Sequence, residues 1–147
     1  MIKKRTGFTF VELLISTVLL ASLFTGVMLT ILKSMELSEL TNNSSLAVLA
    51  AQNKLAEIEN TVFNQVFANY NNATFNPNGL NGKGVSYVDN AIPKVLSITV
   101  VVCFKQANGR LLGEDSNLNG QLDAGEDKDG DGKLDSIVQF TTTKYDL

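Results

Sequence analysis

The fold of the chain depends on one stretch, Gly7-Phe8-Thr9-Phe10-Val11-Glu12-Leu13-Leu14-Ile15-Ser16. It follows three cations at residues 3–5 and opens an apolar run to Leu32 in which Glu12 is the only ionisable side chain. About 20 helical residues, at about 1.5 Å rise each, cross the hydrocarbon core of a bilayer, so this run is long enough to span a membrane. Basic residues before such a run place its start in the cytoplasm and the rest of the chain outside.

The same stretch resembles the N-terminal motif of type IV pilins and of the pseudopilins of type II secretion systems. In that family a short basic leader ends in glycine, an aromatic residue follows, and a glutamate stands four residues later. Here these residues are Gly7, Phe8 and Glu12. The resemblance implies that a prepilin peptidase removes residues 1–7 as a leader and N-methylates the new terminus at Phe8.

The resemblance also implies partners and a location. Pilins and pseudopilins assemble through their apolar helices, so the expected partners are other such subunits, the prepilin peptidase, the inner-membrane assembly platform and the inner membrane. The expected location is the bacterial inner membrane, in a single pass with the head outside the cytoplasm, and a pilus or periplasmic pseudopilus after assembly. Many major pilins carry a proline in the span. Its absence here, together with segment 46–58, resembles a minor subunit.

Glu12 also has a physical reason to be an assembly residue. A carboxylate within a membrane span costs a few kcal/mol on insertion scales, so we expect it to have a partner. It lies about 6 Å along the helix axis from the cleaved amine of Phe8, which it can reach more easily on a neighbouring helix shifted by one turn. That pair would remove two buried charges and set the axial register of a filament. A Glu12 that snorkels to the headgroups is the simpler alternative.

Two other interpretations of the first residues remain. A secretory signal peptide would be cleaved near Ala21-Ser22, but Glu12 would then lie inside its apolar region and the helical pattern continues past the cleavage site. A plain uncleaved anchor explains the hydrophobicity but not Gly7, Phe8 and Glu12 together.

The amino-acid composition limits the functions that the rest of the chain can have. A length of 147 residues fits one modest domain plus a membrane span. The chain has no histidine and one cysteine, Cys103, so it can form neither an internal disulfide nor a Cys/His metal cluster. We expect Cys103 to be a small buried apolar side chain. Histidine is also the commonest general base, and no nucleophile with a base is recognisable, so no enzymatic activity and no nucleic-acid partner are predicted.

An amphipathic stripe continues the helical pattern beyond Leu32. Apolar residues recur at spacings of three and four, with Ser44 in the one gap. They are Leu37, Leu40, Val48, Ala51, Leu55, Ile58, Val62 and Val66. The sequence therefore predicts one helix over residues 8–67, with residues 8–32 as the membrane and assembly segment. Such a helix would be about 90 Å long, so its outer half must pack against a head.

Residues 68–147 are predicted to form that head. Residues 69–90 are rich in Asn and Gly and indicate a long loop with a short edge strand at residues 85–88. The clearest strand covers residues 95–105. Its apolar face should lie on the helix stripe by the period of two; that face consists of Leu96, Ile98, Val100, Val102 and Phe104.

Two further strands complete the predicted sheet. Asn108-Gly109 is typical of a two-residue hairpin turn that leads into a return strand from Arg110. Residues 137–143 supply the last strand, with Val138 and Phe140 inward. The predicted fold class is α+β, a long N-terminal helix with a membrane-spanning half and an amphipathic half, packed against a small antiparallel β-sheet head.

An acidic insert, residues 114–136, separates the last two strands and matches the pattern of a 12-residue calcium loop. Side-chain oxygens stand at positions 1, 3, 5, 9 and 12, a glycine at 6 allows the sharp turn, and a backbone carbonyl is available at 7. The predicted ligands are Asp115, Asn117, Asn119, Gln121, Asp123 and Glu126, and the glycine is Gly120.

A second copy of the loop follows with a period of 12. Its candidate ligands are Asp127, Asp129, Asp131 and Asp135. Position 12 is Val138, so the copy lacks its last ligand, and it is expected to form a weaker site or to share the first ion. The tandem spacing resembles the linked calcium loops of dockerins and thrombospondin type 3 repeats more than a paired EF-hand. In the pilin family, some members also hold calcium in a loop between strands.

Charge supports a cation in this insert. Residues 114–135 contain eight acids and two lysines, a net charge of -6. Loss of the three leader cations would take the chain from -3 to -6, so the insert accounts for the whole charge. Without a cation, like-charge repulsion would raise the energy of the folded head. The sequence thus predicts one or two calcium ions, and a plain solvated acidic loop is the alternative.

Two functional classes remain open at this stage. The favoured one is a structural subunit of a type IV pilus or type II secretion pseudopilus, assembled through its helix, with a calcium-stabilised head. The other is a non-polymerising, membrane-anchored calcium-binding or adhesive module. Pilus, secretion and DNA-uptake machineries share the helix, so the sequence does not choose among them.

Overall fold

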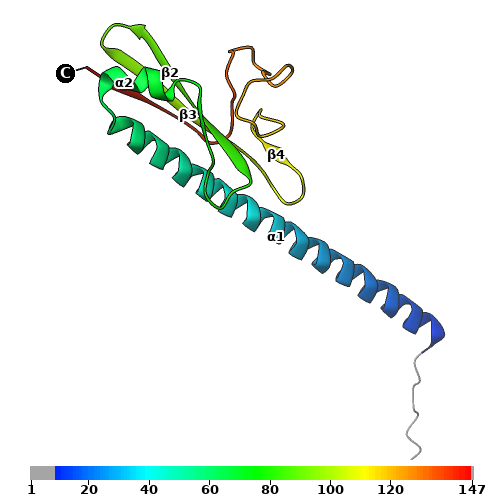
Figure 1. Ribbon diagram of the computed structural model, residues 1–147. Coiled ribbons are helices and arrows are strands. Elements are labelled where there is room, and N and C mark those ends of the chain that lie inside the picture. The colour runs from blue at the N-terminus through cyan, green and yellow to red at the C-terminus, as the bar shows by residue number, and fades with distance from the viewer. Residues whose placement is uncertain (1–8, 147) are drawn as a thin grey trace, which may run out of the picture. The chain divides into compact units, whose positions relative to one another are not determined.

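The computed structural model describes residues 9–146 (Figure 1). The chain divides into two compact units, Met1–Ser38 and Glu39–Leu147, which are described separately. Helix α1 (Phe10–Glu59) belongs to both units, and all other elements belong to the second. These are helix α2 (Phe63–Tyr70) and strands β1 (Ala73–Phe75), β2 (Gly82–Ile92), β3 (Val95–Lys105), β4 (Leu111–Leu112) and β5 (Gln139–Tyr145). The predicted α+β class, a long helix with a small antiparallel sheet, is confirmed.

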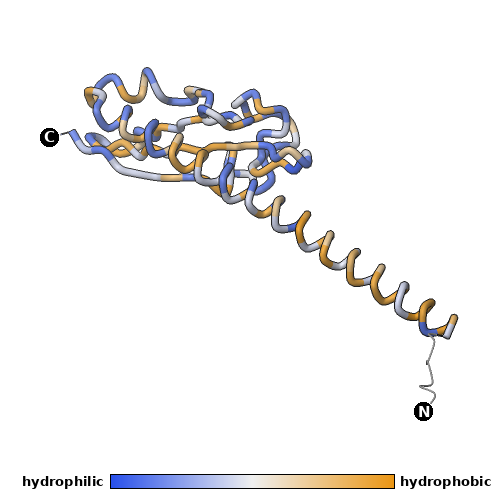
Figure 2. Tube along the Cα trace, turned by 90° about the horizontal axis from the view of Figure 1, so that it is seen from below, coloured by the Kyte–Doolittle hydropathy of each residue, from blue (hydrophilic) through white to orange (hydrophobic). Residues whose placement is uncertain are grey.

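In the first unit, residues 10–38 form a stretch of helix α1 with a largely apolar, exposed surface. Its large apolar side chains are roughly half exposed or more, from Phe10 at 77% to Leu32 at 53%, and Figure 2 shows this part of α1 as mostly orange with paler bands between. Five Ser and Thr hydroxyls in this unit donate to carbonyl oxygens three or four residues earlier in the same helix, as Ser16 does to Glu12. Such bonds leave few free polar groups on the helix surface. By length and composition, α1 is able to cross a membrane.

The second unit is built on β3. The sheet order is β1-β2-β3-β4, and β5 pairs with β3 beside β4. All pairs are antiparallel. The β2–β3 ladder is the longest, from Gly82 opposite Phe104 to Ile92 opposite Val95, with one irregularity after Asp89. Strand β3 is therefore central, which agrees with its continuous run of β-branched and apolar residues.

The inner face of β3 packs on the part of α1 that lies in the second unit. As predicted, Ile98, Val100, Val102 and Phe104 are fully buried, and Leu96 nearly so. They share one core cluster with Ala47, Ala51 and Ile58 of α1 and Val66 of α2. Most of the predicted stripe thus lies in or against the core, whereas Leu37 and Val62 are about two-thirds exposed.

The predicted single helix over residues 8–67 is wrong at its C-terminal end. Helix α1 ends at Glu59, and α2 begins at Phe63 after Val62, whose backbone is extended. Polar side chains take the last carbonyl groups of α1, since Asn60 Nδ2 donates to Ala56 O and Thr61 Oγ1 to Glu57 O. Local side-chain bonds of this kind compete with continuation of the helix. The start of the predicted helix, at Phe8, lies outside the described residues.

The predicted long loop over residues 69–90 is also wrong. It contains β1 and most of β2, and β2 is a central strand rather than a short edge strand at residues 85–88. The sequence did not predict this strand, because the glycines at positions 82 and 84 interrupt the alternation of apolar and polar side chains. A side chain at Gly84 would overlap the ring of Phe75, its cross-strand partner in β1, so the glycine makes room for the ring.

The two later strands are close to the prediction. Strand β5 spans Gln139–Tyr145, so it begins and ends two residues later than expected, and Val138 and Phe140 face the core as expected. The β3–β4 turn is a three-residue loop rather than a two-residue one. Gln106 N donates to Arg110 O, so the loop is residues 107–109, and Gly109 has a φ of 86°. A type I turn followed by a left-handed residue gives this geometry.

Lys144 of β5 holds the end of α1 against the sheet. Its Nζ donates to the carbonyl oxygens of Glu59 and Thr61 at 2.6 Å each and of Ile58 at 3.3 Å. Glu59 O is one of the carbonyl groups at a helix C-terminus that have no partner within the helix, and a cation there also opposes the negative end of the helix dipole.

We expect Lys144→Met to lower the free energy of unfolding of the head by about 1–2 kcal/mol, because charge-assisted bonds are lost while the carbonyl groups can partly rehydrate. Lys105→Met, at an exposed position of the same sheet, is the matched control and should change the value by less than about 0.5 kcal/mol. Urea unfolding of the full chain in detergent measures both. Equal stability of the two variants would contradict this role for Lys144.

Candidate functional site

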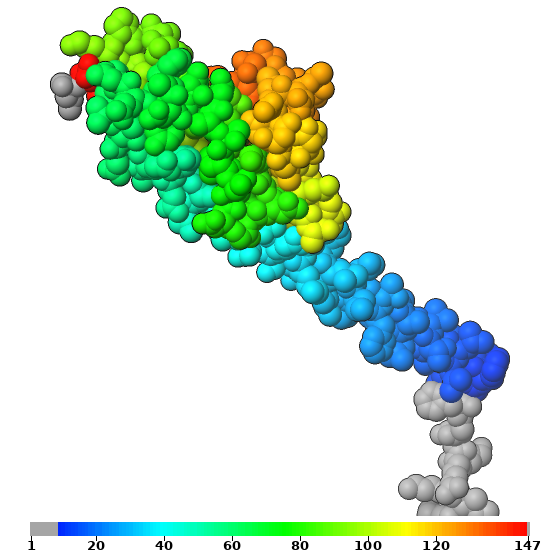
Figure 3. Space-filling view, viewed as in Figure 1, coloured from blue at the N-terminus to red at the C-terminus, as the bar shows by residue number. Residues whose placement is uncertain are grey.

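The acidic insert forms a second layer on the outer face of the sheet. In Figure 3 its orange atoms stand as a compact lobe beside the green atoms of β1 and β2. Leu134 is fully buried in a small cluster with Val85, Val101 and Cys103. Burial raises the pKa of the Cys103 thiol, and the expectation of a small buried apolar side chain is confirmed at 1% exposure.

The first loop is wound around a buried carboxylate. Asp115 is 1% exposed, and it accepts hydrogen bonds from Asn119 N at 3.0 Å and Gly120 N at 2.7 Å. Gly120 has a φ of 79°, which allows the backbone to turn back toward Asp115. The side-chain oxygens at loop positions 3 and 5 accept hydrogen bonds from the backbone amides two residues further on. Asn117 Oδ1 accepts Asn119 N, and Asn119 Oδ1 accepts Gln121 N.

The second loop repeats three of these four bonds at the same offsets, and differs in that Asp127 Oδ1 accepts Gly130 N, three residues on, at 2.7 Å. Asp127 Oδ2 accepts Gly132 N at 3.1 Å, and Gly132 has a φ of 77°. Asp129 accepts Asp131 N, and Asp131 accepts Lys133 N. The two copies predicted from the period of 12 therefore have a similar local winding, although the second is more exposed.

Glu126 closes the first loop from its twelfth position. Its Oε1 accepts Ser116 N at 2.7 Å, and its Oε2 accepts Asp123 N at 3.0 Å. It thus joins the amides of positions 2 and 9. Hydrogen bonds from Ser116, its hydroxyl first, and from the amides hold the pKa of Glu126 below its usual value.

Glu114 closes the second loop in the same way, although it precedes the first. Its Oε1 accepts Lys128 N at 3.1 Å and its Oε2 accepts Asp135 N at 3.2 Å. Lys128 and Asp135 are positions 2 and 9 of the second loop, so Glu114 occupies the role that Glu126 has in the first. Position 12 of the second loop, Val138, is in the hydrophobic core instead.

Sequence reasoning missed Glu114 because it looked for the last ligand only downstream. A signal was present, since the pair Glu114-Asp115 recurs 12 residues later as Glu126-Asp127. In each pair the aspartate begins one loop and the glutamate closes the other.

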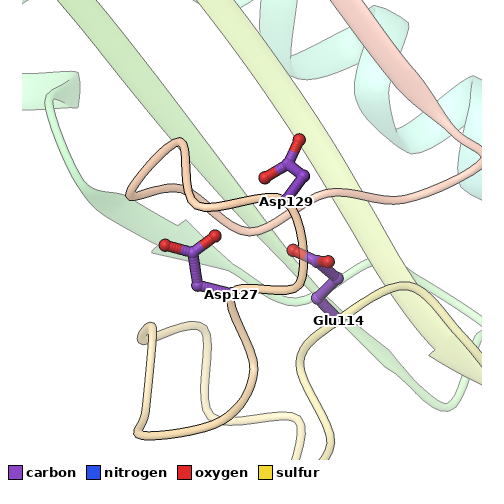
Figure 4. Close-up of side chains that lie close together, drawn as sticks. All are labelled: Glu114, Asp127 and Asp129. Carbon is purple, nitrogen blue, oxygen red and sulfur yellow. The ribbon is translucent and has the colours of Figure 1, made fainter.

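The structure brings many of the predicted ligands together. One carboxylate oxygen each of Glu114, Asp127 and Asp129 lie within 4.8 Å of one another, and Figure 4 shows that these side chains come from two separate segments. Asp129, Asp131 and Asp135 form an overlapping group by the same measure. In the first loop, Asn117 and Asn119 donate to Asp123 Oδ2 at 2.8 Å each. Gln121 lies in the same loop with its side chain exposed.

The surroundings of Asp135 oppose its ionisation. Burial, followed by the charges of Asp131 and Asp129, raises the pKa of Asp135 above its ordinary value. The folded head then binds a proton at Asp135 more readily than the unfolded chain, so this residue reduces stability as the pH rises through its titration. A bound cation would reverse the sign of the local field.

The donor set fits a hard cation. The predicted ligand atoms are carboxylate, amide and carbonyl oxygens, with no nitrogen or sulfur among them. Calcium takes six to eight such oxygens, and soft transition metals prefer thiolate or imidazole. The chemistry of the residues therefore suits calcium, while which oxygens would bind it stays a prediction.

Glu12 is the described member of the other predicted site. It lies in the first turn of α1 with an exposed side chain, and its amide donates to Thr9 Oγ1 at 3.3 Å. Gly7 and Phe8, the predicted processing residues, lie outside the described residues. Pairing of Glu12 with Phe8 of a neighbouring subunit stays a prediction.

Comparison with known proteins bears on the N-terminal segment. Residues 2–28 match the family model described as the prokaryotic N-terminal methylation motif. The match covers the basic leader, Glu12 and most of the apolar run, and it supports a type IV pilin-like, prepilin-processed N-terminus. No curated protein and no solved structure matched the chain.

Proposed function

We propose that the protein is a structural, non-enzymatic subunit of a type IV pilus or a type II secretion pseudopilus, and a minor one. The observation that carries the proposal is the methylation motif at residues 2–28 on a helix whose apolar side chains are uncovered in its own unit. Such a surface needs lipid or other helices around it. The partners would be other pilin-like subunits, reached after processing by the prepilin peptidase at the inner-membrane assembly platform.

The head supports this role over that of a plain anchor. The Glu39–Glu59 part of α1 is an integral part of the core of the second unit, because Ala47, Ala51 and Ile58 are fully buried there. The segment that would assemble and the scaffold of the head are thus one continuous helix. A non-polymerising calcium-binding or adhesive module remains the alternative, and the processing experiment below separates the two.

We further propose that the insert binds two calcium ions. Asp115, Asn117, Asn119, Gln121, Asp123 and Glu126 would hold the first. Asp127, Asp129, Asp131 and Asp135 would hold the second, with Glu114 as the closing carboxylate. What supports a second full site is the equivalence of Glu114 and Glu126, which accept the amides of positions 2 and 9 in their respective loops.

The first prediction of the proposed function concerns processing. We expect the mature protein to begin at N-methylated Phe8, because the motif places the scissile bond after Gly7. Intact-mass measurement of membrane-extracted protein from a host with a prepilin peptidase tests this. A retained leader would favour the plain anchor, and cleavage near Ala21-Ser22 would favour a signal peptide.

The second prediction concerns assembly. We expect Glu12→Ala to insert into the membrane normally but to enter sheared filaments or pseudopili at about a tenth of the wild-type level or less, because the neighbour's terminal ammonium loses its partner. Ser16→Ala, one turn along the same helix, is the control and should assemble normally. Normal incorporation of Glu12→Ala would exclude the pairing of Glu12 with Phe8.

The third prediction concerns calcium. Extracellular calcium modules bind with dissociation constants of roughly 0.1–1 mM, and calcium at ten times the dissociation constant adds about 1.4 kcal/mol per site. We therefore expect the head to melt several degrees higher in millimolar calcium than in chelator. Asp115→Ala should remove most of that shift, and identical melting curves in the two conditions would leave the insert as a solvated acidic loop.

Glu114→Gln tests whether the insert binds one calcium ion or two. The glutamine keeps an oxygen that can accept the amide of either Lys128 or Asp135, but it removes a negative charge from the second loop only. We expect calorimetric titration to show two ions in the wild type and one in Glu114→Gln. An unchanged stoichiometry would mean that Glu114 is not a ligand.

A further inference from the structure

A second candidate site lies beside the insert, in the second unit. It is a cavity of about 360 Å³ on the part of the outer sheet face next to the insert. Strands β2 and β3 form its floor, and its walls come from α2, from the residues after α2, and from Gly132 and Lys133 of the second loop. The volume is at the lower end of the range for small-molecule sites, roughly 300–1,000 Å³, which limits a ligand to one or two small rings.

The lining combines aromatic surface with unused polar groups. Phe67, at 38% exposure, and Tyr87 supply the rings. The side chains of Asn72 and Ser97 make no hydrogen bond within residues 9–146, and the second oxygen of Asp89 is also free there, because only Oδ1 accepts the amide of Ala91. These groups offer both donors and acceptors to a ligand.

The charges around the cavity argue against an anionic ligand. Lys133 and Asp89 line it with opposite signs, and Lys133 Nζ already lies 6.0 Å from the centre of the Tyr87 ring. The neighbouring insert carries a net charge of -6, which two divalent calcium ions would reduce to -2, so it would repel anions such as phosphates with or without calcium. The aromatic rings, together with free donors and acceptors, suit a neutral ligand with many hydroxyl groups.

We propose that this cavity binds one ring of a neutral carbohydrate. The apolar face of a pyranose would stack on the Phe67 ring. Its hydroxyls would donate to Asp89 Oδ2, and Asn72 and Ser97 would supply further hydrogen bonds from the other walls. Each group that carries the assignment lies on a different element, and the cavity is open to the surface of the head, where a surface glycan could reach it.

The test is saturation-transfer NMR on the full chain in a phosphocholine detergent, which avoids sugar headgroups, with millimolar calcium present. The probes are glucose, galactose, mannose and N-acetylglucosamine. We expect at least one of them to bind, with an affinity weakened about three- to ten-fold in Asn72→Gly and in Phe67→Leu. Asn72 has a φ of 57°, so glycine keeps its backbone while the side chain is removed.

Lys94→Gly is the matched control, because Lys94 also has a positive φ, 65°, and does not line the cavity. It should bind the sugar as the wild type does. Absence of binding to all four sugars, or binding that both cavity variants leave unchanged, would overturn the proposal. Because thermal melting measures the calcium effect separately, an intact calcium shift without sugar binding rejects the carbohydrate site alone.

Discussion

The packing of α1 on the inner face of β3 is the contact on which the rest of the second unit depends. Ala47 and Ala51 are small, so the helix backbone can approach the sheet closely, and Phe104, Val100 and Ile98 fill the interface without exposure to solvent. This contact gives the otherwise polar outer half of α1 an apolar partner. It also fixes the direction of β3, from which β2, β4 and β5 take their registers.

The acidic insert packs on the opposite, outer face of β3. Val101 and Cys103 point to the outer face of β3, and Leu134 covers them. Further bonds attach the insert to the sheet, from Leu134 N to the Tyr87 hydroxyl at 2.8 Å and from the Ser136 hydroxyl to Val102 O at 2.6 Å. An acidic segment is thus held over an apolar surface, so its repulsion acts directly on the strand that organises the head. A cation bound in the insert, as proposed, would therefore affect the stability of the sheet as well as the loops.

The spacing of apolar residues in the sequence predicted the helices and strands that bury large apolar side chains on one face or on both. It located β3 at its observed bounds, most of the α1 stripe, and β5 to within two residues, because burial in these segments is carried by large apolar side chains. It failed for β2, where glycines at 82 and 84 make room for Phe104 and Phe75. It also failed at Glu59, where the helix ends through side-chain bonds from Asn60, Thr61 and a lysine 85 residues away.

In the candidate site as well, contacts between residues close in the sequence could be predicted, whereas contacts between distant residues could not. The loop bonds of Asp115 and Asp127 span at most five residues, so spacing alone could place them. The contact of Glu114 with Asp135 spans 21 residues and exists only because the two loops fold side by side. Since Glu114 and Asp115 are adjacent in the chain but belong to different loops, as do Glu126 and Asp127, neither loop can change its winding without moving a carboxylate of the other. Two ions held in this way would bind as a coupled pair, with the first ion ordering a ligand of the second.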